Sequence, residues 1–405
     1  MSNVKIQMIR KSQILLLEAV VSFVLLLFFT FLSHTVLAEE TSQLGKHVFD
    51  LQYRPSGFAF RIALHQWINR VSFEKEPDFG HRDIVRGLIP VGPDKKEHVG
   101  FAWDRGEAKL YLDLNRNRDL TDDPNGAFQS KEGGRFQHFR DIPLELQKDS
   151  FKLPYMIQMD MYHYGRGSYS YSATIVSGFA AEIELYGRKW YVAVVDNMHG
   201  KLGPGDQFFL TPLGVDFGAG TKWHVLQKVP KNIFFDSHNY DLSFEFQAGK
   251  KNPSLQLTLT EFQRPMGRIN IEGEYIARLA LESASTTVLL DYPEKSVLIP
   301  AEDYHCTGIY LYGGDVGLFQ PIRTGQAKPE PISVPEDGSA TFKAGGPLKN
   351  TVDVKRTGSI LTLDYKLIGA DERSYERLYG RSDKPPTFTI YKSDRKIASG
   401  EFEYG

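Results

Sequence analysis

The chain has 405 residues, a formal net charge of −2 at pH 7 and a single cysteine. A net charge this close to zero argues against a nucleic-acid partner, which a basic surface would bind. One cysteine also excludes an intrachain disulfide, so stability has to come from a large core or a bound metal. The length is sufficient for two or three domains of ordinary size.

Residues 1–38 have the pattern of an export signal. Three basic residues precede the apolar run VVSFVLLLFFTFL, and Ala38 ends the sequence TVLA, which is typical of a cleavage site. The alternative is an uncleaved anchor, because residues 19–38 carry no charge and are about long enough to span a bilayer. We favour cleavage, since two polar residues weaken the distal half of a span. Either way the rest of the chain is exported, to the periplasm, the cell surface or the extracellular space.

The remaining sequence predicts a mostly β protein. Apolar stretches with period-two alternation dominate, and Gly, Pro, Asn and Asp interrupt them. The aromatic share of 13% suits sheets better than helix bundles. The clearest predicted strands are 109–114, 180–187, 189–196, 240–247, 254–262, 275–281, 286–292, 308–313, 360–369 and 387–392.

Two regions follow the export segment. The first, 46–262, is β-rich, and the stretch QRPMG at 263–267 is typical of a linker. The second, 268–405, has short predicted strands at the spacing of an antiparallel β-sandwich.

One loop in the first region has the pattern of a calcium site. In LYLDLNRNRDLTDDPNGAF, oxygen-bearing side chains recur at every second position after a strand. Ca²⁺ takes six to eight oxygen ligands, and loops supply them from alternating positions. Leu120 is expected to insert into the core beneath the loop. The candidate calcium ligands are Asp113, Asn115, Asn117, Asp119, Asp122 and Asp123.

Over about ten residues this loop resembles the calcium loops of EF-hands and dockerins, with two departures. Arg118 replaces the glycine of the sharp turn, where left-handed geometry costs roughly 1–2 kcal/mol. Pro124 replaces the bidentate glutamate. We therefore expect a structural ion with an affinity of roughly 10⁻⁴ to 10⁻³ M. The alternative is a turn rich in Asp and Asn that bonds its own backbone and holds no metal.

A weak internal repeat relates this loop to a second one. KLYLDLNRNRDL resembles KWYVAVVDNMHGKL, which keeps Asp196, Asn197 and the distant Asp206. Met198 and Gly200 stand where ligands would be expected. The sequence therefore predicts a hairpin of the same shape without an ion.

A tyrosine-rich hairpin, MDMYHYGRGSYSYSA, is the candidate binding surface. With a four-residue turn at 165–168, alternation would place its four tyrosines on one face. That face would be either buried or a contact surface for sugar rings or a protein. The four residues are Tyr162, Tyr164, Tyr169 and Tyr171.

Catalytic signatures are absent from the sequence. It contains no GxSxG, no HExxH and no phosphate-binding glycine loop. Glu182 and Glu184 alternate on one predicted strand, which is typical of a solvated face. His199 and His305 are expected to be surface or core residues, and Cys306 to be a buried thiol.

Six segments carry a resemblance to a group of uncharacterised exported bacterial proteins. This resemblance implies a β-rich architecture whose C-terminal part is similar to immunoglobulin-like or prealbumin-like sandwiches, and it implies no reaction. We expect an exported, calcium-stabilised protein with a binding or structural role at the cell envelope, toward a glycan or another envelope component. The alternative is a secreted hydrolase of polysaccharide or peptide that uses carboxylates far apart in sequence. The segments are FEKEPDFG, RGLIPVGPDKK, LYLDLNRNRDLTDDPNGAF, WYVAVVDN, IPAEDY and GEFEYG.

Overall fold

The computed structural model shows the predicted mostly β fold. All ten of the strands predicted above coincide with strands, and the one helix among the described residues is the 3₁₀ turn η1 (Pro93–Lys95). None of the described residues forms a helix with the length and apolar character that a membrane crossing requires. The predicted export segment lies outside the described residues, which are 45–62, 71–80, 83–165, 168–203, 205–214, 227–249, 252–313, 316–319, 330–377 and 386–402.

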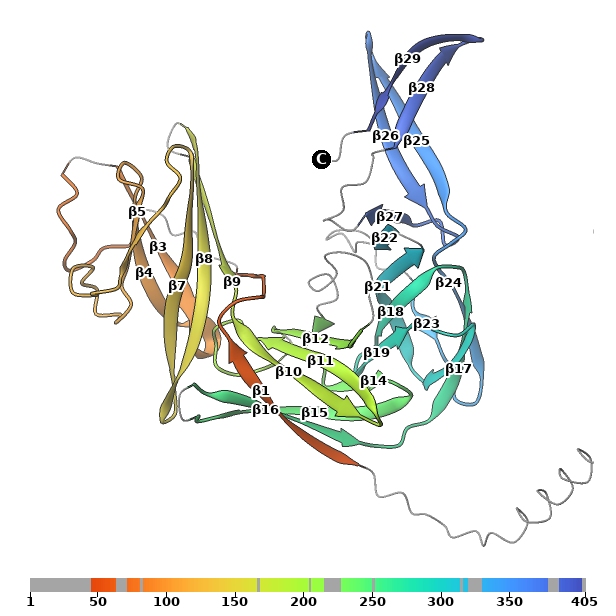
Figure 1. Cartoon of the computed structure of the whole chain (residues 1–405), viewed down its shortest axis with the longest axis horizontal. Helices are drawn as coiled ribbons and strands as arrows, with labels where there is room; N and C mark the ends of the chain where they lie inside the picture. Colours follow the sequence, from red (N-terminus) through yellow and green to blue (C-terminus); the bar gives the residue numbers. More distant parts are fainter. Residues whose placement is uncertain are drawn as a thin grey trace, which may run out of the picture. The chain divides into compact units, whose positions relative to one another are not determined.

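Two four-stranded sheets lie in the first half of the chain (Figure 1). Their strands are antiparallel to their neighbours throughout. One sheet has the order β3 (Ile84–Val91), β4 (Glu97–Asp104), β5 (Lys109–Leu112), β6 (Ala127–Gln129). The other has the order β2 (Phe60–Ile62), β9 (Ser168–Ile175), β8 (Phe151–Gly165), β7 (Phe136–Lys148).

A larger sheet of 16 strands runs through both predicted regions. The link between them is the parallel pairing of β14 with β19, in which Ile233 lies beside Thr287. In order, its strands are β13 (Gln227–Lys228), β12 (Gln207–Pro212), β11 (Arg188–Val195), β10 (Gly178–Leu185), β1 (Lys46–Arg54), β16 (Ser254–Glu261), β15 (His238–Gln247), β14 (Asn232–Phe235), β19 (Thr286–Asp291), β18 (Ile276–Glu282), β21 (Asp303–Gly313), β22 (Val316–Phe319), β27 (Ser374–Arg377), β26 (Ile360–Ile368) and β25 (Lys349–Thr357), with β23 (Ile332–Ser333) beside β21.

The C-terminal region contains a sandwich-like core. A three-stranded sheet shares one apolar cluster with β18, β19 and β21, and Ile269, Phe342 and Leu281 are among its members. The pairing is not wholly antiparallel as expected, because β17 and β24 run parallel. The three-stranded sheet has the order β20 (Ser296–Pro300), β17 (Met266–Glu272), β24 (Ser339–Lys343), and a separate hairpin consists of β28 (Thr387–Lys392) and β29 (Arg395–Glu401).

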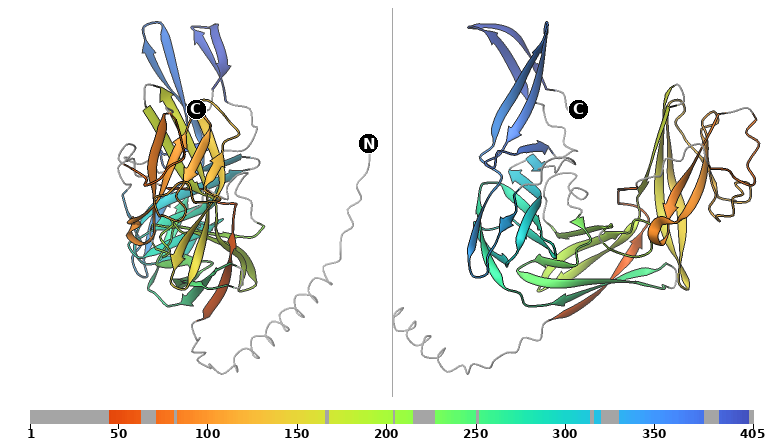
Figure 2. Two further views of the ribbon diagram at one scale, coloured as in Figure 1. Left: turned by 90° about the vertical axis from the view of Figure 1, so that its left-hand side faces the viewer. Right: turned by 180° about the vertical axis from the view of Figure 1, so that it is seen from behind.

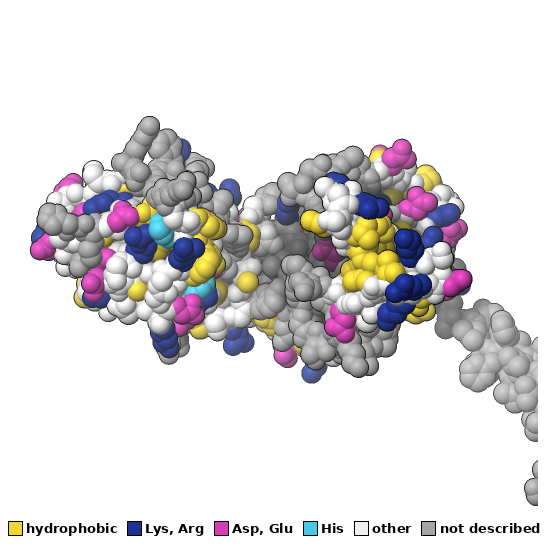
Figure 3. Space-filling view, turned by 90° about the horizontal axis from the view of Figure 1, so that it is seen from above, with side chains coloured by type: hydrophobic (Ala, Val, Ile, Leu, Met, Phe, Trp, Pro, Cys, Tyr) yellow, Lys and Arg dark blue, Asp and Glu magenta, His cyan; other side chains and the backbone are white. Residues whose placement is uncertain are grey.

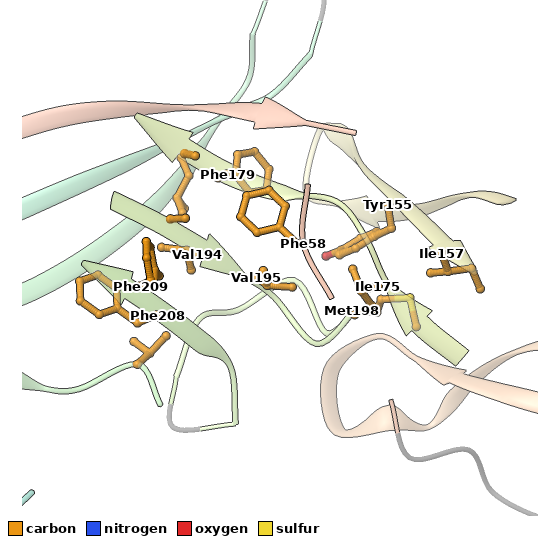
Figure 4. Packing of buried hydrophobic residues seen from close by; sticks show 14 of the residues in the cluster. Phe58, Tyr155, Ile157, Ile175, Phe179, Val194, Val195, Met198, Phe208 and Phe209 are labelled. Carbon is orange, nitrogen blue, oxygen red and sulfur yellow. The ribbon is translucent and has the colours of Figure 1, made fainter. Parts of the chain in front are cut away.

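The largest apolar cluster joins all the sheets of the first half. In β16 the alternating Leu255, Leu257 and Leu259 are buried, as the period-two pattern predicts. Figure 4 shows strands of two sheets meeting in this cluster, where Met198 lies among Tyr155, Ile175 and Val195. Met198 belongs to the second of the two loops that resemble each other in sequence, so that loop is anchored in the core.

The tyrosine hairpin forms, but its predicted register is wrong. Tyr162 pairs with Ser170, and His163 pairs with Tyr169, because an irregularity between His163 and Gly165 shifts the strands by one residue. Such a shift moves one strand's side chains to the opposite face. Arg166 and Gly167 of the predicted turn lie outside the described residues.

The four tyrosines are therefore divided between core and surface. Tyr171 is buried and packs edge-to-face on Phe101, with ring centroids 5.3 Å apart. Tyr169 packs on Trp103, whereas Tyr164 is 63% exposed. Tyr162 is half-buried and contacts the ring of Phe136. The single tyrosine face that the sequence suggested does not exist.

This division predicts opposite effects of two truncations in one hairpin. Tyr171→Ala should lower the free energy of unfolding by roughly 3–5 kcal/mol, as for other buried aromatic truncations. Tyr164→Ala should change it by less than about 0.5 kcal/mol, since its side chain faces solvent. Denaturant melts of the two variants make the comparison, and equal losses in both would contradict the observed register.

Candidate metal centre

The loop from Asp113 to Asp123 follows β5 and is held from two sides. The Asp113 N–H donates to the carbonyl of Gly100 on β4, at 2.9 Å. On the other side, Lys75 forms a bridge with Asp119, and the Leu120 N–H donates to the Lys75 carbonyl at 3.0 Å. Leu120 is buried beneath the loop, as predicted.

The loop's own side chains bond its backbone, as in a chain of Asx turns. The side-chain oxygen of Asn115 accepts from the Asn117 N–H at 3.0 Å, and that of Asn117 accepts from the Asp119 N–H at 2.8 Å. The Asp123 carboxylate accepts from the N–H groups of Leu114 and Asn115, at 2.9 and 3.2 Å. This part of the geometry belongs equally to an ion-free turn and to a calcium loop.

The environment of Asp113 bears on these two alternatives. Its side chain is 3% exposed, and one carboxylate oxygen, Oδ1, is buried with no hydrogen-bond partner. The other, Oδ2, accepts from the Arg118 N–H at 3.1 Å. A buried charged oxygen without a partner costs far more than a neutral one. A bound cation is one partner that would meet that cost, and a water molecule is another.

Like charges add to this cost. Burial raises the pKa of Asp113, opposing the backbone N–H groups that lower it, and the charge of Asp122 raises it further. Burial likewise raises the pKa of Asp123, with contributions from Asp113 and Asp122. The three carboxylates thus repel one another within one loop, and a bound cation would relieve that repulsion.

Both arginines of the loop turn their side chains away from its carboxylates. Arg116 pairs with Glu97 and donates to the Glu145 carbonyl at 2.8 Å, and Arg118 donates to the Ser72 carbonyl at 2.7 Å. Both have left-handed backbones, with φ of 64° and 70°. The strain expected at Arg118 is therefore present, and the contacts of both guanidinium groups lie outside the loop.

Asp119 differs from the other candidate ligands in where its carboxylate lies. It accepts from the N–H of Thr121 at 2.8 Å and lies 3.5 Å from the Lys75 ammonium. In EF-hand loops the seventh position ligates through its backbone carbonyl. The Asp119 side chain would therefore not be needed as a ligand and can keep its contacts with Thr121 and Lys75.

The second loop, from Asp196 to Asp206, has the same frame as the first. In each, a buried aspartate follows a strand and a second aspartate stands ten residues later. In each, the N–H after the first aspartate donates to the second: Leu114 to Asp123 at 2.9 Å, and Asn197 to Asp206 at 2.8 Å. The weak sequence repeat therefore corresponds to a shared hydrogen-bond geometry.

His199 occupies the space between the two carboxylates of the second loop. Its Nδ1 lies 3.1 Å from Asp196 Oδ1, and its Nε2 lies 3.1 Å from Asp206 Oδ1. Only the protonated ring can donate from both nitrogens, whereas in the neutral ring Nδ1 accepts from the Lys201 N–H at 3.3 Å. The hydrogen bond to Asp206 is the main cause that raises the pKa of His199. Sequence reasoning missed this residue, because its role depends on Asp206, seven positions away.

The same three residues also form a donor set suited to a transition metal. Among the described residues, only Asp196, His199 and Asp206 bring three charged or imidazole ligand atoms within 4.8 Å of one another. However, Asp196 already accepts from Tyr155 Oη at 2.6 Å and from the Gly200 N–H at 2.8 Å. The second loop therefore suits two arrangements: a protonated His199 between the two carboxylates, or a metal held by all three residues.

The two loops share neighbours. The Gly92 N–H, at the end of β3, donates to the Met198 carbonyl of the second loop at 2.8 Å. Glu97, at the start of β4, pairs with Arg116 of the first. The β3–β4 turn therefore contacts both loops.

The other residues considered from the sequence do not form a site. Glu182 and Glu184 are exposed on β10, as predicted. Cys306 is buried, and burial raises the pKa of its thiol to about 11. Tyr304 shares its core, but Tyr310 belongs to the other cluster, because β21 changes register between these residues. Comparisons of the chain with protein-family models, with curated proteins and with solved structures found no match.

The imidazolium in the second loop predicts a pH-dependent stability. His199 has a raised pKa, and burial raises that of Asp196 to about 6, so the folded state binds more protons than the unfolded state. For Asp196 this stability is lost as the pH rises from 3.8, the ordinary pKa of the group, to about 6. For His199 it is present below about 6.5, the ordinary pKa of histidine, and is lost as the pH rises through the raised pKa. His199→Gln should make the free energy of unfolding depend less on pH between pH 6 and 8. At pH 6 the substitution should lower the free energy of unfolding by roughly 3–5 kcal/mol, as for other broken buried pairs.

Thermal melts across this pH range measure the effect, with His305→Gln as the control. An unchanged slope in His199→Gln would contradict the imidazolium. A second outcome would also contradict it: micromolar Zn²⁺ raises the melting temperature of the wild type but not that of His199→Gln. That result would assign Asp196, His199 and Asp206 to a metal site.

Proposed function

We propose that the Asp113–Asp123 loop binds Ca²⁺ and that the ion stabilises an exported β protein of the cell envelope. The observation that supports this most directly is the buried, unpartnered Oδ1 of Asp113. A hard cation with oxygen ligands is the partner such an oxygen needs. The export pattern of residues 1–38 supports the location, because extracellular calcium is abundant enough for a weak site.

The ligands would come from both ends of the loop. Asp113, Asp122 and Asp123 would supply carboxylate oxygens, and Asp119 would supply its carbonyl. The three carboxylates would have to move together, because their oxygens do not all lie within 4.8 Å of one another. Asn115 and Asn117 donate their amide N–H groups to Asp122, at 3.1 and 2.6 Å. Each amide would have to turn over to present oxygen to the ion, which contributes to the weak affinity that we expect.

The role of the ion is structural. The loop connects β5 to β6 through Gly126, whose N–H donates to the Asp123 carbonyl at 3.0 Å. A Cβ on Gly126 would lie 2.6 Å from the Leu112 carbonyl, so the turn closes only with glycine. Ion binding would fix this turn in a chain that has no disulfide.

For the contact with an envelope glycan, we propose a surface on β7 and β8 in place of the single tyrosine face. Phe136 is 49% exposed, pairs with Tyr162 across the strands and contacts its ring at 5.1 Å. Tyr164 lies two residues further along β8 and is exposed. Exposed aromatic rings suit stacking on sugar rings.

Calcium should raise the melting temperature, and Asp113→Asn should remove most of the rise. At a free concentration about tenfold above the dissociation constant, linkage gives roughly 1.4 kcal/mol. For a domain of 150–250 residues that is a shift of roughly 3–6 °C. Scanning calorimetry in chelator and in 10 mM CaCl₂ measures it, with Asp149→Asn, an exposed aspartate outside the loop, as the matched control. Identical melting curves in both buffers would reject the site.

A further inference from the structure

The two C-terminal hairpins, β25–β26 and β28–β29, carry apolar side chains into solvent. Thirteen large apolar side chains are exposed among the described residues, and six of them lie on these hairpins. Ile360 is 67% exposed and Tyr391 is 60% exposed. A concentration of exposed apolar residues of this kind marks an interaction surface. The six are Val352, Val354, Ile360, Leu361, Tyr391 and Ile397.

The strand register gathers part of this set on one face. Val352 pairs with Tyr365 and Val354 pairs with Leu363, so these side chains share one side of β25–β26. The ring of Phe402, which follows β29, contacts Tyr365 with centroids 5.3 Å apart and so links the two hairpins. Both hairpins extend in the same direction from the sheets (Figures 1 and 2).

Basic residues surround the apolar ones at both tips. Segments 355–361 and 391–397 contain five Lys or Arg and one Asp, a net charge of +4 in a chain whose total is −2. Within the part of the chain that the structure describes, none of the five forms an ion pair. Figure 3 shows dark blue Lys and Arg side chains beside the yellow apolar patch on this side of the molecule. The five are Lys355, Arg356, Lys392, Arg395 and Lys396.

The base of β25–β26 is different. There Lys366 lies near both Asp353 and Asp364, so its charge is compensated within the hairpin. Five basic residues without an ion pair among the described residues thus gather at the tips, close in sequence to the exposed Ile360 and Tyr391. This combination is what an anionic surface with an apolar interior would bind.

We propose that the tips of β25–β26 and β28–β29 dock on an anionic lipid bilayer. A soluble polyanion would engage the basic residues but leave Ile360 and Tyr391 in water. A bilayer takes both, because apolar side chains enter the boundary between headgroups and acyl chains while Lys and Arg stay at the phosphates. The hairpins pair their own backbone groups, so shallow insertion leaves few of them unsatisfied. This contact is additional to the N-terminal segment, through which alone the sequence suggested membrane contact.

Vesicle binding tests the proposal on residues 39–405, which contain the compact unit Gly45–Gly405 without the apolar export segment. Sedimentation with 1:1 phosphatidylglycerol–phosphatidylcholine vesicles should show binding, and pure phosphatidylcholine should show little. Each of Lys355→Gln and Lys392→Gln should weaken partitioning about fivefold. Ile360→Ser should weaken it further, while Leu298→Ser, which is equally apolar and 50% exposed on β20, should not.

A fluorescent label reports insertion directly. Cys306 is the only cysteine and is buried, so Ile360→Cys provides one reactive thiol for an environment-sensitive dye. The emission should shift to the blue with anionic vesicles. Binding of dextran sulfate as tight as binding of vesicles, with no blue shift, would overturn the lipid assignment in favour of a polyanion. Self-association lost in Ile360→Ser would overturn it in favour of a second copy, and absence of vesicle binding would overturn it outright.

Discussion

Two buried aspartates, Asp113 and Asp196, constrain the first half of this molecule. Each residue stands at the end of a strand and is 3% exposed, where an ionised carboxylate is costly unless it is paired. The surrounding loops reduce that cost with backbone N–H groups, which point inward because the chain adopts left-handed turns at Arg118 and Gly200. A cation would neutralise the remaining negative charge.

The two loops meet this requirement differently. In the second loop the ring of His199 lies between Asp196 and Asp206, and its protonated form would supply a positive charge from within the chain. In the first loop no side chain of either arginine turns inward, and the Oδ1 of Asp113 keeps no partner. We interpret this difference as follows: the second loop supplies its own positive charge, and the first loop takes a cation from solution. Their shared contacts with the β3–β4 turn place both charges beside the same element.

Local patterns in the sequence predicted much of this structure. Alternating burial in strands such as β16 depends on neighbouring residues, so period two identifies it. The loop at Asp113 was found from its two-residue spacing, and Leu120 from its place after the turn. In contrast, a single irregularity at Tyr164 reversed the faces of the tyrosine hairpin, which no alternation pattern reveals.

Contacts between distant residues explain the other failures. The role of His199 requires that loop closure bring Asp206 back to Asp196, and the composition of the loop does not encode that closure. The parallel pairing of β14 with β19 joins segments about fifty residues apart and crosses the predicted linker at 263–267. The sequence of neither strand indicates which strand it pairs with, because both are short apolar segments.

The number of calcium ions bound per chain shows whether the first loop takes its cation from solution. Equilibrium dialysis with ⁴⁵Ca²⁺ at millimolar free calcium and neutral pH should give one ion for the wild type. It should give none for Asp113→Asn, because the second loop is filled by His199. A wild-type value of zero, or a value of one that persists in Asp113→Asn, would contradict the account.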